Sequence, residues 1–199
     1  MGGSLVILCC FCLGTLCAWL GWLPRGLPAH DATLYVLYAL MLLVGFSIGY
    51  DRRLGEILRT LRPRVLLLPL ATTVGTFAGT ALVSLFMVYS LSECLAVGSG
   101  FAYYSLSSVF ITQYKGAELG TVSLMANILR ELITLVFAPL LVRWISPLAP
   151  ISCGGASTMD TTLPVIARCA GQQWVFVSIV HAMILDFSVP FWVTFFCTH

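Results

Sequence analysis

The sequence predicts an all-α, polytopic integral membrane protein with about seven helical segments, two of them interrupted. Hydrophobic residues make up 59% of the 199 residues and charged residues only 9%, and the mean hydropathy is +0.99. Soluble domains carry about 25% charged residues, so this composition excludes a soluble domain. Because apolar runs long enough to cross about 30 Å of hydrocarbon recur along the whole chain, we expect residues 1–199 to form a single transmembrane domain.

Basic residues gather in one connection between apolar runs, at Arg52, Arg53, Arg59, Arg62 and Arg64. By the positive-inside rule this connection is cytoplasmic, which also places the N-terminus inside and the C-terminus outside. The first apolar run has no Lys or Arg before it, so we expect a retained helix and not a cleaved signal peptide. The eight cysteines lie mostly in apolar runs and act there as small hydrophobes.

Five uninterrupted apolar spans are expected, at residues 5–23, 33–50, 65–89, 119–142 and 174–196. The arginine-rich connection follows the second span and has leucines at helical spacing, which favours a short interfacial helix. Small residues in the third span would let another helix pack closely against it.

Two further segments, at residues 91–116 and 147–170, are interrupted at their centres. The first is broken by "GSG" at 98–100 and by the polar run 103–108, and the second by "ISCGGASTMDTTLP". Non-helical backbone is tolerated in a membrane only where it is buried in protein or lines a wet cavity. A pair of such breaks is the strongest sequence indication of a transporter's substrate site.

Each interrupted segment could cross the membrane once or re-enter as a hairpin. Arms of about ten residues rise about 15 Å, half of the hydrocarbon core, so hairpins fit and are favoured. Hairpins would place Arg143 and Arg168 inside, whereas two crossings would place Arg143 outside. In either case we expect residues 99–104 and 157–160 to be neighbours at the midplane, because an isolated break could not satisfy its own backbone in lipid.

Glu131 lies about halfway along its span, where an ionisable residue is a functional candidate by default. Asn127 lies four residues earlier and shares its helix face. Arg130 points elsewhere, and we expect it to pair with an acidic residue, for which the candidates are Asp160, Glu93 and Glu118.

Polar residues of the two breaks are candidates for binding a substrate. In the second break these are Ser157, Thr158 and Asp160. Asp160 could instead cap a half-helix that begins near Thr161, with Pro164 in its first turn, and the two roles are compatible. The first break offers the hydroxyls of Tyr103, Tyr104 and Ser105, which could equally satisfy freed backbone carbonyls.

His181 lies in the last span and could take part in a proton relay. The alternative is a hydrogen-bonded histidine that packs helices together. Asp186, five residues further on, is too far round the helix to pair well with it.

Three stretches resemble the LysO lysine exporter family: "SGFAYYSLSSVFITQYKGAELGTVSLMANILRELITLVFAPLLVR", "GGASTMDTTLPVI" and "SIVHAMILDFSVPF". The resemblance covers about residues 35–196 and looks like the C-terminal two thirds of the full-length family pattern. It implies export of L-lysine and toxic analogues such as thialysine across the bacterial inner membrane, coupled to protons or another cation. It further implies an acidic transport residue at Glu131, and a small membrane partner or a homo-oligomer in place of the missing spans.

The sequence therefore predicts a secondary transporter and not an enzyme, with Glu131, Asp160 and His181 as proton-coupling candidates. No Walker A loop is present, so the energy must come from an ion gradient or a separate ATPase. No cofactor, metal site or nucleic acid partner is expected. An alternative is an intramembrane hydrolase with Ser99 as nucleophile and His181 as base, and a channel is a third option.

Overall fold

The computed structural model describes residues 63–199, together with Leu13, Leu16, Cys17, Leu20, Tyr35 and Leu42. The helices from Pro63 onward belong to one compact unit, residues 51–199. Nearly all of the first two predicted spans and of the predicted interfacial helix lies outside the described residues, so those three predictions remain untested.

Three long helices form the frame of this unit: α4 (Pro63–Ser84), α7 (Ala117–Trp144) and α10 (Val175–Thr198). The described residues contain three stretches long and apolar enough to cross a membrane, at Leu66–Ser84, Ala117–Trp144 and Gln172–Thr198. Only the end predicted for the third span was wrong, because α4 stops at Ser84. The next three residues form tight turns through hydrogen bonds to carbonyls three residues back, which direct the chain into the next helix.

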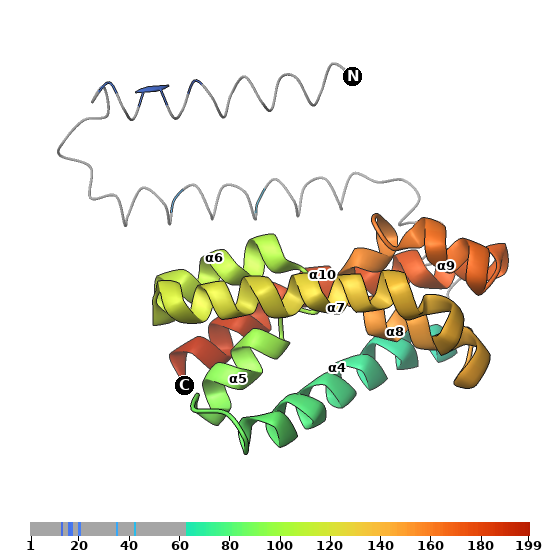
Figure 1. The fold of residues 1–199 in the computed structure, drawn as a ribbon, viewed down its shortest axis with the longest axis horizontal. Helices are drawn as coiled ribbons and strands as arrows, with labels where there is room; N and C mark the ends of the chain where they lie inside the picture. The colour runs from blue at the N-terminus through green and yellow to red at the C-terminus, as the bar shows by residue number, and fades with distance from the viewer. Residues whose placement is uncertain (1–12, 14–15, 18–19, 21–34, 36–41, 43–62) are drawn as a thin grey trace. The chain divides into compact units, whose positions relative to one another are not determined.

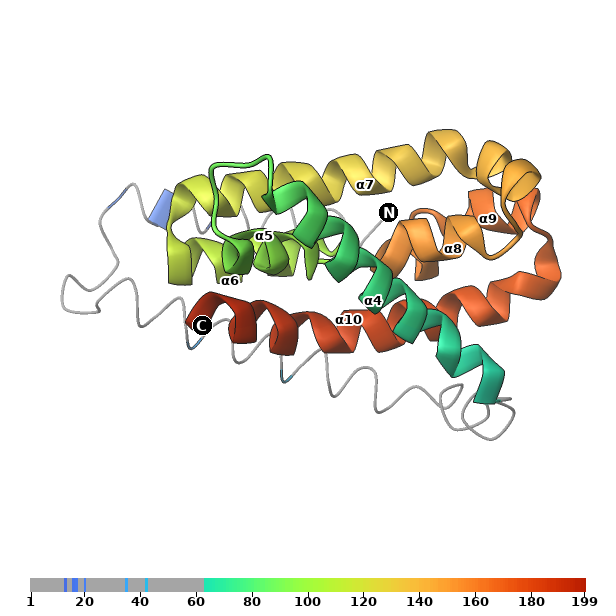
Figure 2. The ribbon, with the colours of Figure 1, turned by 90° about the horizontal axis from the view of Figure 1, so that it is seen from below.

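Two short helical hairpins enter the frame from opposite ends (Figures 1 and 2). The first consists of α5 (Leu91–Gly98) and α6 (Tyr104–Lys115), and both of its ends lie where α7 begins. The second consists of α8 (Ala149–Gly154), the 3-10 helix η1 (Gly155–Met159) and α9 (Leu163–Cys169), and both of its ends lie where α7 ends. The hairpin topology favoured from arm length is therefore the one observed.

Local sequence explains where the first hairpin begins and ends. Ser90 and Glu93 form a capping box: the Ser90 hydroxyl accepts from the Glu93 N–H, and the Glu93 carboxylate accepts from the Ser90 N–H at 2.9 Å. The Ser90 N–H and the Ser90 hydroxyl both donate to the Glu93 carboxylate, and these two bonds hold the pKa of the Glu93 carboxyl below its usual value. At the other end Gly116, with φ of 98°, joins α6 directly to α7.

The polar run at 103–108 does not interrupt the first hairpin in the way predicted, because residues from Tyr104 onward are helical. The non-helical residues are 99–103. The Ser107 hydroxyl donates to the Tyr103 carbonyl at 2.8 Å, so it satisfies a backbone group one turn earlier and is compatible with a helix.

Candidate functional site

The tips of the two hairpins touch each other at the centre of the unit. The backbone N–H of Ala156 in η1 donates to the carbonyl of Phe101 in the first break, with an N···O distance of 2.8 Å. Gly155 lies at this junction with φ of 60°, and a Cβ there would collide with the Phe101 carbonyl. The prediction that the two breaks are neighbours is confirmed.

The first break is strained and is held from outside by α7. Phe101 and Ala102 are buried non-glycine residues with positive φ, 44° and 69°. The Oδ1 atom of Asn127 accepts from the Ala102 N–H at 2.8 Å, and its Nδ2 donates to the Val97 carbonyl at 3.3 Å and the Ser123 carbonyl at 2.9 Å. Asn127 therefore supplies the hydrogen bonds that the broken helix loses.

The second break is held mainly by its own hydroxyls and by α10. The Thr158 hydroxyl donates to the carbonyls of Gly155 and Ser178, at 2.7 and 3.2 Å. In return, the Ser178 hydroxyl donates to the Thr158 carbonyl at 2.9 Å. The hydroxyl of Thr162 donates to the Ser157 carbonyl at 3.1 Å, so the carbonyls of Gly155, Ser157 and Thr158 in η1 are paired within the protein.

Asp160 follows η1 but does not cap α9, which corrects the predicted capping role. The N-cap of α9 is Thr162, which makes no side-chain capping bond, and the expected Pro164 does fall in the first turn. The Asp160 carboxylate accepts from the N–H of the adjacent Thr161 at 2.6 Å and remains exposed. Asp160 also lines the space between the tips.

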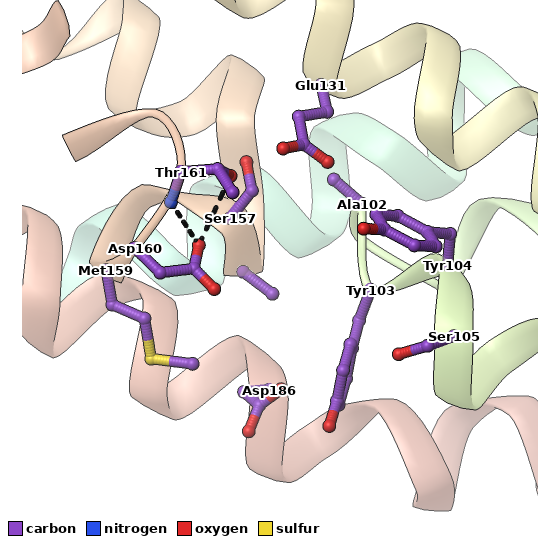
Figure 3. Close-up of a pocket in the computed structure, with 11 residues that line it drawn as sticks. Ala102, Tyr103, Tyr104, Ser105, Glu131, Ser157, Met159, Asp160, Thr161 and Asp186 are labelled. Atoms are coloured by element: carbon purple, nitrogen blue, oxygen red, sulfur yellow. Dashed lines mark hydrogen bonds between the residues drawn. The ribbon is translucent and has the colours of Figure 1, made fainter. Parts of the chain in front are cut away.

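That space is a cavity of about 190 Å³ with acidic walls (Figure 3). Three carboxylates line it: Glu131 from α7, Asp160 from the second break and Asp186 from α10. Glu131 and Asp186 are buried, with exposed fractions of 9% and 5%. The remaining lining residues are Ala102, Tyr103, Tyr104, Ser105, Ala156, Ser157, Met159 and Thr161. None of the described lining residues is basic.

Six predicted site residues therefore share this cavity: Tyr103, Tyr104, Ser105, Glu131, Ser157 and Asp160. The other three do not line it. Asn127 and Thr158 are occupied in supporting the breaks, as described above. His181 is fully buried between helices, and its Nε2 lies 3.0 Å from the Thr72 hydroxyl of α4.

The residues of the alternative hydrolase site are not paired. The Ser99 hydroxyl donates to the Ala96 carbonyl of its own helix at 2.7 Å, and His181 bonds Thr72. A nucleophile and its base need to be within hydrogen-bond reach of each other. This arrangement gives the hydrolase no support.

Arg130 binds backbone and not an acidic residue, which corrects the predicted ion pair. Its Nε donates to the Cys153 carbonyl at 2.7 Å and one terminal nitrogen donates to the Ser152 carbonyl at 3.1 Å, at the C-terminal end of α8. Its guanidinium carbon also lies 5.8 Å from the ring centroid of Phe101. The Arg130 guanidinium thus binds the carbonyls at the C-terminal end of α8 in the second hairpin, and it also contacts the tip of the first hairpin.

Asp186 is the site residue that sequence reasoning missed. Its spacing from His181 indicates no pairing between the two, but α10 turns Asp186 toward the cavity. The signal that could have found it is the rule already applied to Glu131, that a carboxylate within a membrane span is functional by default.

Comparison with known proteins identifies relatives over most of the chain. Residues 8–197 match the family described as "Lysine exporter LysO", a longer match than the 35–196 expected. The chain is 33% identical over 170 residues to the protein named "Lysine exporter LysO" of Escherichia coli, covering 84% of this chain and 56% of that protein. It is 31% identical over 186 residues to a "Putative lysine exporter" of Haemophilus influenzae, covering 92% and 91%. No solved structure matches it significantly.

Proposed function

The chain belongs to the lysine exporter LysO family, and we propose that it is a secondary transporter that exports L-lysine and lysine analogues across the bacterial inner membrane. The observation that carries this proposal is the cavity between the two hairpin tips. It lies between membrane-spanning helices, it is lined by three carboxylates, and none of its described lining residues is basic. The chain spans only about half the length of the E. coli relative, so the activity of this chain itself is what is proposed.

Charge balance supports a cationic substrate. Each acidic residue within a membrane span costs about 2.5–3.5 kcal/mol on insertion scales. Glu131 and Asp186 come from two such spans and point into the same cavity. A substrate with two ammonium groups offsets that cost when it binds, whereas an anionic substrate would increase it.

The substrate carboxylate needs hydrogen-bond donors, and the cavity offers hydroxyl groups. Tyr103, Tyr104 and Ser105 line it at the start of α6. We assign the carboxylate of lysine to these donors instead of to the start of α9, because no residue of that helix lines the cavity. Phenol and alcohol groups can donate to a carboxylate without adding a fixed positive charge that would repel the ammonium groups.

In the proposed coupling step Glu131 alternates between the substrate ammonium and a proton, so that export of a cation is exchanged for entry of a proton. Asp160 is a second proton-coupling candidate. His181 is left out of this path because it bonds Thr72 away from the cavity.

The test is efflux of labelled lysine from loaded vesicles, with and without a pH gradient. Glu131→Gln, which keeps the shape and loses the charge, is expected to abolish coupled efflux, and Asp160→Asn to reduce it less. Glu118→Gln is the matched control, because Glu118 lies on the same helix but is exposed and bonds Tyr89 outside the cavity. Efflux by Glu131→Gln at the unmodified rate, with unchanged pH dependence, would contradict the assignment.

We further propose that the end of the unit where α4 begins is cytoplasmic. Arg64, Arg143 and Arg168 lie in the first turn of α4 and the last turns of α7 and α9, all at this end. Among the described residues the opposite end carries Lys115 against these three arginines, so the positive-inside rule favours this orientation and an external C-terminus. The same vesicle assay, repeated with any small membrane protein encoded beside this chain, tests whether a partner or a homo-oligomer is needed.

A further inference from the structure

Asp186 is a buried carboxylate with an oxygen that no described residue binds. Its exposed fraction is 5%, and its Oδ1 atom has no hydrogen-bond partner among the described residues. It faces the same cavity as Glu131 and Asp160. A buried carboxylate left unpaired is strongly unfavourable, so such a group is satisfied by a proton or by a bound cation.

The three carboxylates are spread over the cavity walls and do not converge on one point. Within residues 63–199 no three His, Cys, Asp or Glu side chains are grouped closely enough to hold a metal ion. In Figure 3, Glu131 and Asp186 lie on opposite sides of the cavity. Asp160 and the Tyr103 ring face each other across the space between these two carboxylates. This spacing suits an elongated ligand with a positive group at each end better than a single metal ion.

We propose that Asp186 is a specificity-determining residue, which binds the second ammonium group of an α,ω-diamino acid whose first ammonium group is bound by Glu131. The inference rests on the proposed transport function and adds that the site discriminates between substrates by their length. The two carboxylates project from α7 and α10, two long helices. A diamino acid of matching length satisfies both acidic residues, whereas a shorter one or a neutral amino acid leaves one buried carboxylate unpaired.

A purely structural role for Asp186 makes a different prediction. If Asp186 were a protonated residue that only packs against Tyr103 and Met159, asparagine would replace it with little change in transport. Lengthening the side chain would then alter the amount of folded protein but not the choice between substrates. The choice of substrate is therefore the decisive measurement.

The experiment measures efflux of lysine and of ornithine, which is one methylene shorter, from vesicles containing the unmodified chain or a variant. Asp186→Asn is expected to lower lysine efflux at least about tenfold. Asp186→Glu extends the carboxylate by one methylene and is expected to shift the ornithine-to-lysine ratio toward ornithine by about tenfold or more, the lower end of what one methylene contributes to discrimination. Ser188→Ala is the control on the same helix, since that hydroxyl bonds only the Leu185 carbonyl of its own helix.

The ornithine-to-lysine ratio is measured within one variant, so it does not depend on how much of that variant folds. Asp186→Glu therefore tests the inference even if Asp186→Asn fails to insert. An unchanged ratio in Asp186→Glu would overturn the inference, even if lysine efflux fell. So would lysine efflux by Asp186→Asn at the unmodified rate. If the unmodified chain exports neither substrate, the proposed function fails first, which separates the two outcomes.

Discussion

The two hairpins enter the membrane frame in the same way but keep their broken backbones satisfied differently. In the first hairpin, the residues with positive φ depend on a side chain from another helix, because Asn127 of α7 accepts from the Ala102 N–H. In the second, the bend occurs at a glycine, and the hydroxyls of Thr158 and Thr162 share the hydrogen bonding with groups from other helices. Those groups are the Ser178 hydroxyl of α10 and the Arg130 guanidinium of α7. The first break therefore depends on one external side chain, whereas the second combines its own hydroxyls with groups from α7 and α10.

The two tips also contribute different chemistry to the cavity. The first supplies the neutral hydroxyls of Tyr103, Tyr104 and Ser105, and the second supplies the carboxylate of Asp160. The other two carboxylates come from the long helices that hold the hairpins. Strained backbone and fixed charge are thus placed on different elements around one site, so each can be altered separately.

The largest loss of stability and transport is expected from Gly155→Ala, which alters the bend of the second hairpin. Its backbone conformation is unfavourable for any residue with a Cβ, at a cost of about 1–3 kcal/mol. The new methyl group would in addition collide with the Phe101 carbonyl and break the contact between the tips. We expect a loss of more than about 3 kcal/mol of stability in detergent, measured by thermal unfolding, together with loss of lysine efflux.

Gly75→Ala is the matched control for this substitution. Gly75 lies inside α4, and a Cβ there would meet no atom within 4 Å, so stability should change little. If Gly155→Ala unfolds at the same temperature as Gly75→Ala, the junction between the tips does not hold the second hairpin in place.

A smaller but clear effect is expected from Asn127→Ala, which removes the external support of the first hairpin. The Ala102 N–H would lose its partner in a buried site, at a cost of about 1–3 kcal/mol, whereas the Val97 carbonyl would keep its bond from the Gly100 N–H. Lysine efflux should fall as well, because the released tip carries the tyrosines of the cavity. Unfolding temperature and efflux are measured together on the same preparation.

Thr121→Ala provides the comparison, since Thr121 is exposed on the same helix and bonds only the Ala117 carbonyl. If Asn127→Ala matched Thr121→Ala in both measurements, the first break would not depend on this one external side chain, and the contrast between the hairpins would disappear.

The order of the helices and the two interruptions could be predicted because they follow from local composition. Apolar length fixes the long helices, and glycine with hydroxyl residues marks the breaks. Arm length was enough to favour hairpins, as observed. The polar run at 104–108 was misjudged because hydroxyls that bond carbonyls three or four residues earlier are compatible with a helix.

The contacts that build the site could not be predicted, because they join residues far apart in the sequence. Nothing local indicates that Arg130 binds the carbonyls of Ser152 and Cys153, or that Asn127 holds Ala102. Asp186 was missed for a related reason: α10 is apolar on nearly all sides, so its sequence does not reveal which face turns toward the cavity.

The smallest effect is expected at the entrance of the first hairpin, where Ser90→Ala removes the capping box of α5. Loss of an N-cap costs about 0.5–2 kcal/mol, and this cap lies far from the tip, so stability should fall modestly and efflux should be retained. Ser84→Ala is the control, because that hydroxyl only bonds the Ala81 carbonyl at the end of α4.

The loss of stability in Ser90→Ala should also depend on pH, since hydrogen bonds from Ser90 lower the pKa of the Glu93 carboxyl in the folded chain. A lowered pKa in the folded state stabilises the fold above the pKa of the unfolded chain, and this contribution is lost as the pH falls through the folded value. Ser90→Ala removes the hydrogen bond from the hydroxyl to the Glu93 carboxylate but keeps the one from the Ser90 N–H. The difference in unfolding temperature between the unmodified chain and Ser90→Ala should therefore be largest at neutral pH and shrink on acidification, without vanishing, because the cap bond from the Glu93 N–H to the hydroxyl does not titrate. A difference that stays constant down to pH values where Glu93 is protonated would show that the hydroxyl stabilises the fold only through that cap bond.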